Sequence, residues 1–170
     1  ADSTYTPTVI ANPVATADTT SGPQGVAQSI VVTNNDSAAS GQELVTPSVT
    51  LSCSTTPTTP ACVRNTDGTV TITGQGTYSA AAADGTVVFT PLPTFTGTAK
   101  PVVYTVKDDL DQSATSTYTP TVIPAPVAVA DTSKNGQDIN QTINVLGNDT
   151  IPANGNALDP TSVKLCALAD

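Results

Sequence analysis

The sequence predicts an all-β fold made of β-sandwich modules in tandem, and three observations lead to this prediction. Thr, Val, Ala, Ser and Pro dominate the 170 residues, and β-branched residues favour strands over helices. The 14 Pro and 11 Gly residues divide the chain into short segments, as turns between strands do. The sequence that begins at Ser3 also recurs from Ser116 onward, which indicates a repeated module.

The repeat defines the modules. Residues 3–25 (STYTPTVIANPVATADTTSGPQG) and residues 116–138 (STYTPTVIPAPVAVADTSKNGQD) are identical at 15 of 23 positions. A second similarity links LVTPSVTL at residues 44–51 to LDPTSVKL at residues 158–165, with an offset longer by one position, which a loop insertion explains. We therefore expect residues 1–11 to be the last strand of a preceding module, residues 12–123 to be a complete module, and residues 124–170 to be the incomplete first part of the next.

Seven strands are expected within the complete module, because strand-like runs alternate with turn signals at short intervals. They cover residues 26–33, 48–52, 69–73, 76–79, 86–91, 101–107 and 114–123. Asp84-Gly85 predicts a hairpin turn, since Gly adopts positive φ without steric cost. The alternation of residues 102–106 is expected to place Tyr104 on the inward face. Because Pro120 has no N–H for a ladder bond, its strand should lie at a sheet edge or be bulged there.

The composition limits both the core and the function. Only two Phe and four Tyr are present, so the core should be built from Val, Ile, Leu and Ala. The chain has no His, a single Glu and no G-x-S-x-G nucleophile elbow, so we expect no enzymatic activity. The net charge of −9 argues against nucleic acid as a partner. No apolar run approaches the roughly 20 residues that cross a bilayer, so no membrane insertion is expected in this segment.

The cysteines suggest a short disulfide-closed loop. Cys53 and Cys62 enclose a polar stretch with little of its own to order it, and a bridge between them is favoured over two free thiols. Cys166 occupies the position of Cys53 in the next copy of the repeat, so its partner is expected beyond the segment. An intermolecular bridge or a reactive thiol is the alternative for Cys166.

Two groups of acidic residues are candidate calcium sites, because hard oxygen donors at turns bind this ion. The first follows a strand-like run and consists of Asp108, Asp109 and Asp111. The second lies near the start of the module, and it contains Asp18, Asn35 and Asp36, which recur in the next copy as Asp131, Asn148 and Asp149. The alternatives are solvated turn carboxylates for the first group and turn capping by Asn and Asp side chains for the second. Apart from this structural calcium, no cofactor is expected.

The second half of the module carries five sequence blocks in a characteristic order. They read GQGTY at residues 74–78, DGTVVFTP at 84–91, FTGTA at 95–99, PVVYTVKD at 101–108 and TYTPTV at 117–122. This succession resembles the CshA-type fibril repeat of large bacterial surface adhesins. INVLGND at residues 143–149 is similar to the start of Ig-like and cadherin-like modules of such adhesins. The loop between Cys53 and Cys62 departs from the plain fibril repeat.

The resemblance implies Ig-like β-sandwich modules on the bacterial cell surface, where they form an extracellular stalk that projects adhesive regions from the cell. Neighbouring repeats would be the partners of each module. One alternative is an adhesive module that binds a host or cell-surface ligand. Another is a self-assembling filament, in which the N-terminal segment of one chain completes the unfinished module of a neighbour by strand addition. The residues that would form this added strand are Thr4, Tyr5, Thr6, Thr8, Val9 and Ile10.

Overall fold

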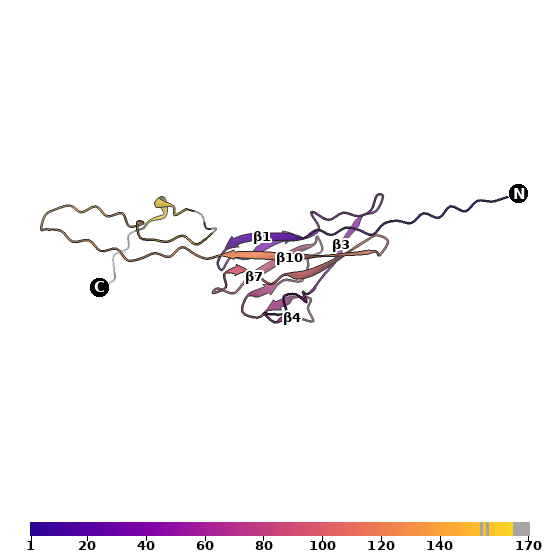
Figure 1. The fold of residues 1–170 in the computed structure, drawn as a ribbon, viewed down its shortest axis with the longest axis horizontal. Helices are drawn as coiled ribbons and strands as arrows, with labels where there is room; N and C mark the ends of the chain where they lie inside the picture. Colours follow the sequence, from indigo (N-terminus) through magenta and orange to yellow (C-terminus); the bar gives the residue numbers. More distant parts are fainter. Residues whose placement is uncertain (154, 156, 165–170) are drawn as a thin grey trace. The chain divides into compact units, whose positions relative to one another are not determined.

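Strands make up nearly all the regular structure in the computed structural model, which describes residues 1–153, 155 and 157–164. The chain divides into two compact units, Ala1–Val122 and Ile123–Asp170 (Figure 1). Two β-sheets form the first unit. Among its described residues, the second unit contains the short 3-10 helix η1 (Pro160–Ser162) and an isolated bridge between Val127 and Thr150.

The two sheets pack against each other as a β-sandwich, as the sequence predicts. One sheet has the order β1-β10-β9-β3, with β8 also paired to β10. The other has the order β2-β7-β6-β5-β4. The strands of the first sheet are β1 (Asp18–Pro23), β3 (Leu44–Cys53), β8 (Gly97–Thr98), β9 (Val102–Asp108) and β10 (Ser113–Ile123). Those of the second are β2 (Gln28–Val31), β4 (Cys62–Arg64), β5 (Val70–Ile72), β6 (Gly76–Tyr78) and β7 (Thr86–Pro91).

All seven predicted strands overlap an observed strand, but β1, β4 and β8 were not predicted. The sequence of β1, DTTSGP, contains no large apolar residue, so no alternation reveals it. Hydrogen bonds to distant residues hold it instead, because Thr20 donates to Gln28 and its hydroxyl lies 2.9 Å from the hydroxyl of Tyr118. The other two strands have three residues and two residues, which is too short for a periodic pattern.

The core contains more aromatic residues than the composition suggested. Tyr78, Tyr104, Tyr118 and Phe89 are fully buried among the aliphatic side chains. The expectation of a purely aliphatic core is therefore wrong. The buried tyrosines are tolerated because each hydroxyl finds a polar partner, as when Tyr78 donates to the carbonyl of Lys100 at 2.7 Å. The inward orientation predicted for Tyr104 is confirmed.

Pro120 lies in an interior strand, where the ladder is irregular. β10 has neighbours on both sides, so the edge position is not what accommodates this proline. Thr98 pairs with Thr121 and Val102 pairs with Tyr118, so three residues of one strand lie opposite two of the other. This is a β-bulge, with residues 99–101 facing residues 119–120. A bulge was expected in the strand of Pro120 itself, but the extra residue lies on the partner strand.

The predicted turn at Asp84-Gly85 is present. Gly85 has φ of 84°, and the side chain of Asp84 accepts a hydrogen bond from the Thr86 amide at 2.9 Å. The turn closes an antiparallel pair, β6 and β7, but the full connection spans residues 79–85 and not two residues. The chain uses the tight turn within a longer loop.

Candidate functional site

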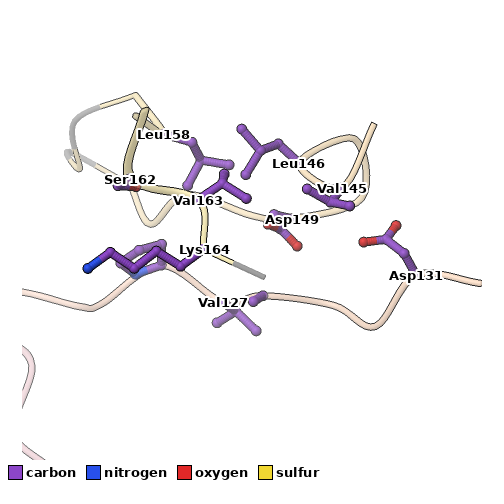
Figure 2. Close-up of a pocket in the computed structure, with 11 residues that line it drawn as sticks. Val127, Asp131, Val145, Leu146, Asp149, Leu158, Ser162, Val163 and Lys164 are labelled. Carbon is purple, nitrogen blue, oxygen red and sulfur yellow. The ribbon is translucent and has the colours of Figure 1, made fainter. Parts of the chain in front are cut away.

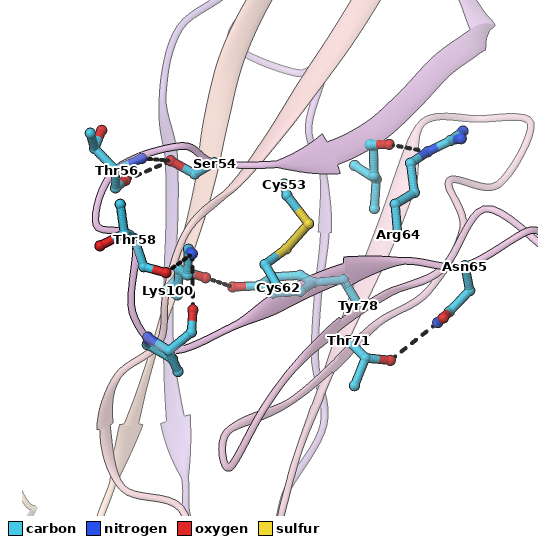
Figure 3. The surroundings of a disulfide bond; sticks show 12 residues. Cys53, Ser54, Thr56, Thr58, Cys62, Arg64, Asn65, Thr71, Tyr78 and Lys100 are labelled. Atoms are coloured by element: carbon cyan, nitrogen blue, oxygen red, sulfur yellow. Dashed lines mark hydrogen bonds between the residues drawn. A yellow bond between two sulfur atoms is a disulfide. The ribbon is translucent and has the colours of Figure 1, made fainter.

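The disulfide predicted between Cys53 and Cys62 is present and joins the two sheets. Cys53 ends β3 in one sheet and Cys62 begins β4 in the other (Figure 3). The bond therefore closes the loop of residues 54–61 and also crosslinks the sandwich. Cys166 lies outside the described residues, so the partner expected for it stays a prediction.

The buried side chain of Lys100 donates hydrogen bonds to the disulfide-closed loop. The residue is 4% exposed, and its Nζ donates to the carbonyl of Pro60 at 2.9 Å and to that of Thr58 at 3.4 Å. Its main-chain N–H donates to the side chain of Gln75 at 2.7 Å. The bulge opposite Pro120 contains this lysine, so the irregularity of the ladder gives the loop its internal donor (Figure 3). Sequence reasoning missed this role, because the bulge depends on pairing between strands.

The acidic residues expected near the start of the module do come together. Asp36 accepts hydrogen bonds from the Thr16 amide at 2.7 Å and from the Tyr104 hydroxyl at 2.9 Å. The neighbouring Asn35 donates to the carbonyl of Ala17 at 3.4 Å. Burial is the main cause that raises the pKa of Tyr104, and the bond to Asp36 adds to it, so this hydroxyl remains protonated. Tyr104 was predicted to face inward, but no sequence pattern predicted its hydrogen bond to Asp36.

Asp18 is the most buried member of this group. The residue is 5% exposed, and its Oδ2 atom is buried without a hydrogen-bond partner. Burial raises the pKa of Asp18 to about 6, and the charge of Asp36 contributes to this rise, while hydrogen bonds from Tyr104 and Asn35 act in the opposite direction. The carboxylate thus lies in surroundings that disfavour its charged form.

The second unit repeats the same local arrangement. Asp149 accepts a hydrogen bond from the Val129 amide at 2.8 Å, and Asn148 donates to the carbonyl of Ala130 at 3.4 Å. In the sequence repeat, these residues align with the ones that make the same hydrogen bonds in the first unit. The bridge between Val127 and Thr150 matches the bridge between Val14 and Ser37 in the same way.

Asp131 and Asp149 line a hollow of about 400 Å³ in the second unit. In Figure 2 their carboxylates face each other at one end of this hollow. Val145 and Val163, which also line it, are the counterparts of Val32 and Val49, both buried in the core of the first unit. The hollow therefore lies where core residues are expected from the repeat.

The first acidic group is not brought together. Asp108 is buried at the end of β9, where its Oδ1 accepts from the amides of Leu110 at 3.0 Å and Gln112 at 2.8 Å. Asp109 accepts from the Glu43 amide at 3.4 Å. Asp111 is exposed and forms an ion pair with Lys107 at 3.0 Å. Within the described ranges, no group of three or more Asp, Glu, Cys or His side chains gathers in a way that would hold a metal.

The N-terminal segment is extended and exposed. Residues 3–10 repeat residues 116–123 of β10 without a difference. Tyr118 and Val122 of β10 are buried, whereas their counterparts Tyr5 and Val9 are 88% and 94% exposed. The segment has the sequence of an inner strand, but it forms no strand within its own unit.

Comparison with models of protein families matches residues 10–122 to the surface adhesin CshA repetitive domain. The comparison with curated proteins found no match. The matched range coincides closely with the β-sandwich. No helix among the described residues has the length and hydrophobicity needed to span a bilayer.

Proposed function

Because the chain belongs to the family of the CshA repetitive domain of surface adhesins, we propose that residues 12–123 form one stalk module of a bacterial surface fibril. In this role the module has no catalytic activity and binds no host or cell-surface ligand of its own. Its function is to add length and stability to a longer protein that carries adhesive regions away from the cell. Neighbouring repeats are its partners.

The main support for this proposal is that the hydrogen bonds at the N-terminal end of the module recur in the second unit. The same hydrogen bonds are made around Asp36 and around its repeat counterpart Asp149. An adhesive site for one host or cell-surface ligand would be expected on one repeat, whereas a spacer is expected to repeat the same scaffold, including any groups that stabilise it. The crosslink between Cys53 and Cys62 also suits a module selected for durability.

Replacing one module in the full-length surface protein tests the stalk role. Deletion of residues 12–123 should shorten the surface fibrils in electron micrographs by the length of one module. An unrelated β-sandwich of equal length in the same place should restore both fibril length and adhesion of the cells under flow. If the unrelated module restores length but leaves adhesion impaired, the repeat itself binds the ligand, and the stalk proposal is wrong.

A second candidate function is supported by the exposed N-terminal segment. Residues 3–10 have the sequence of β10, yet the apolar side chains of Tyr5 and Val9 have no core to pack into. In an array they would belong to a preceding module. The competing proposal is a filament in which they add as a strand to the second unit of a neighbouring chain.

A further inference from the structure

The carboxylate of Asp18 is buried, and one of its oxygen atoms has no hydrogen-bond donor. It stands at the first position of β1, and its Oδ2 atom receives no hydrogen bond. A buried acceptor left without a partner destabilises the folded state, and it does so more strongly when it is charged. A positively charged ligand at this position would remove that destabilisation.

Further oxygen atoms surround Asp18. The charge of Asp36 acts on the pKa of Asp18, and the Tyr104 hydroxyl interacts with both carboxylates. The Thr16 carbonyl accepts from Tyr104 at 2.8 Å, which places a main-chain oxygen at the same cluster. Carboxylates and main-chain carbonyls are hard oxygen donors that calcium takes in proteins, and the Tyr104 hydroxyl hydrogen-bonds to one of each.

The recurrence of the pair supports a structural role for it, such as holding a stabilising cation in every repeat. Asp131 and Asp149 hold the corresponding positions in the second unit and line one hollow there (Figure 2). An acidic pair with no role would gain nothing from being kept twice, since two nearby carboxylates repel each other.

We propose that Asp18 and Asp36 bind a calcium ion at the start of the β-sandwich. Ca²⁺ accepts six to eight oxygen ligands in flexible geometry, so water would complete the coordination, whereas Mg²⁺ demands a near-ideal octahedron. The ion would connect the start of β1 in one sheet to the segment that follows β2 in the other. It would stabilise a stalk module and a ligand-binding module alike, so its absence would leave the proposed stalk function untouched.

Luminescence of Tb³⁺, a calcium analogue, tests the site in the intact chain. Excited tyrosine sensitises a nearby Tb³⁺ ion, and the Tyr104 hydroxyl donates to Asp36 at 2.9 Å, so this side chain would sensitise an ion at the proposed site. Tyrosine-excited emission should rise to saturation with Tb³⁺ and fall when CaCl₂ is added. Asp18→Asn should weaken Tb³⁺ binding at least about tenfold. Even the loss of a residue that only hydrogen-bonds to a metal ligand lowers metal affinity about 10–100-fold. The control Asp2→Asn, in the exposed N-terminal segment, should bind as the wild type does.

Thermal unfolding gives the second readout. CaCl₂ should raise the Tm of the wild type and of Asp2→Asn, since a ligand of the native state stabilises it by mass action, and should leave that of Asp18→Asn unchanged. Tyr104→Phe removes the nearest sensitiser but keeps both carboxylates, so its Tb³⁺ emission should fall while its calcium-dependent rise in Tm persists. Equal Tb³⁺ affinity of Asp18→Asn and wild type, or a wild-type Tm that calcium does not change, would overturn the proposal.

Discussion

The buried side chain of Lys100 shows how a charge can serve as a structural donor. Its ammonium group lies beside the carbonyls of Thr58 and Pro60, in a loop that has no sheet pairing of its own. Main-chain carbonyls that lose such a donor must find water or remain unsatisfied. The lysine and the disulfide thus order the same loop by different means.

Lys100→Met should lower the free energy of unfolding by about 1–3 kcal/mol, because it keeps most of the unbranched side chain and removes the charged donor. Urea unfolding followed by circular dichroism measures the change. Lys107→Met is the matched control, since Lys107 is half exposed and makes only a surface ion pair with Asp111, and it should cost no more than about 0.5 kcal/mol. Equal losses for the two variants would contradict the role assigned to Lys100.

Single residues differed in how far the sequence could predict them. The alternation around Tyr104 predicted its burial, because period-2 patterning is local. The recurrence of Asp18 and Asp36 predicted their association. The burial of Lys100 depends on a bulge between β8–β9 and β10, and the contact of Tyr104 with Asp36 joins residues 68 positions apart, so no local pattern contained either.

Among the strands, β6 depends on a close approach that only glycine permits. A Cβ atom on Gly76 would collide with the carbonyl oxygen of Thr90 and lie 2.9 Å from two ring carbons of Phe89. Both of these residues belong to the neighbouring strand β7. Gly74 is in the preceding turn, and a Cβ there would meet no atom within 4 Å, although its φ of 75° is in the left-handed region.

Gly76→Ala should therefore destabilise the sandwich by at least about 2 kcal/mol through overpacking. Gly74→Ala should cost about 1 kcal/mol, since only its backbone conformation is unfavourable. Thermal unfolding of the two variants beside the wild type measures both effects. A larger loss for Gly74→Ala would show that backbone strain outweighs the contact with β7.

The strands also differ in whether the local sequence predicts them. Runs such as residues 102–108 are visible because apolar and polar side chains alternate along them. β1 is almost entirely polar, and its position is set by Thr20, whose hydroxyl contacts Gln28 of β2 and Tyr118 of β10. Strand formation there is a consequence of tertiary contacts, which override weak local preference.

For the whole molecule, the repeat was the most informative feature of the sequence. It predicted that the start of the module would recur, and the hydrogen bonds of Asp149 and Asn148 in the second unit match those of Asp36 and Asn35. Whether the segment of residues 3–10 serves a preceding module or a neighbouring chain depends on a partner that the sequence of one chain does not specify.

If the segment adds to a neighbouring chain, sedimentation velocity of the 170-residue chain should show polymers that grow with concentration. Tyr5→Ser combined with Val9→Ser should abolish them, because these side chains match the buried face of β10. Thr6→Ser combined with Thr8→Ser, on the opposite face, should leave them intact. A wild-type chain that stays monomeric over the whole concentration range would eliminate the filament and leave the stalk.

The neighbouring positions of β1 and β10 have a mechanical consequence. They are the first and last strands of the sandwich, and they are hydrogen-bonded to each other. If such modules form the proposed stalk and a tethered cell pulls on it, tension enters each sandwich at one of these strands and leaves at the other. The bonds between β1 and β10 would bear that tension first, while the crosslink between Cys53 and Cys62 lies outside the direct path of the force.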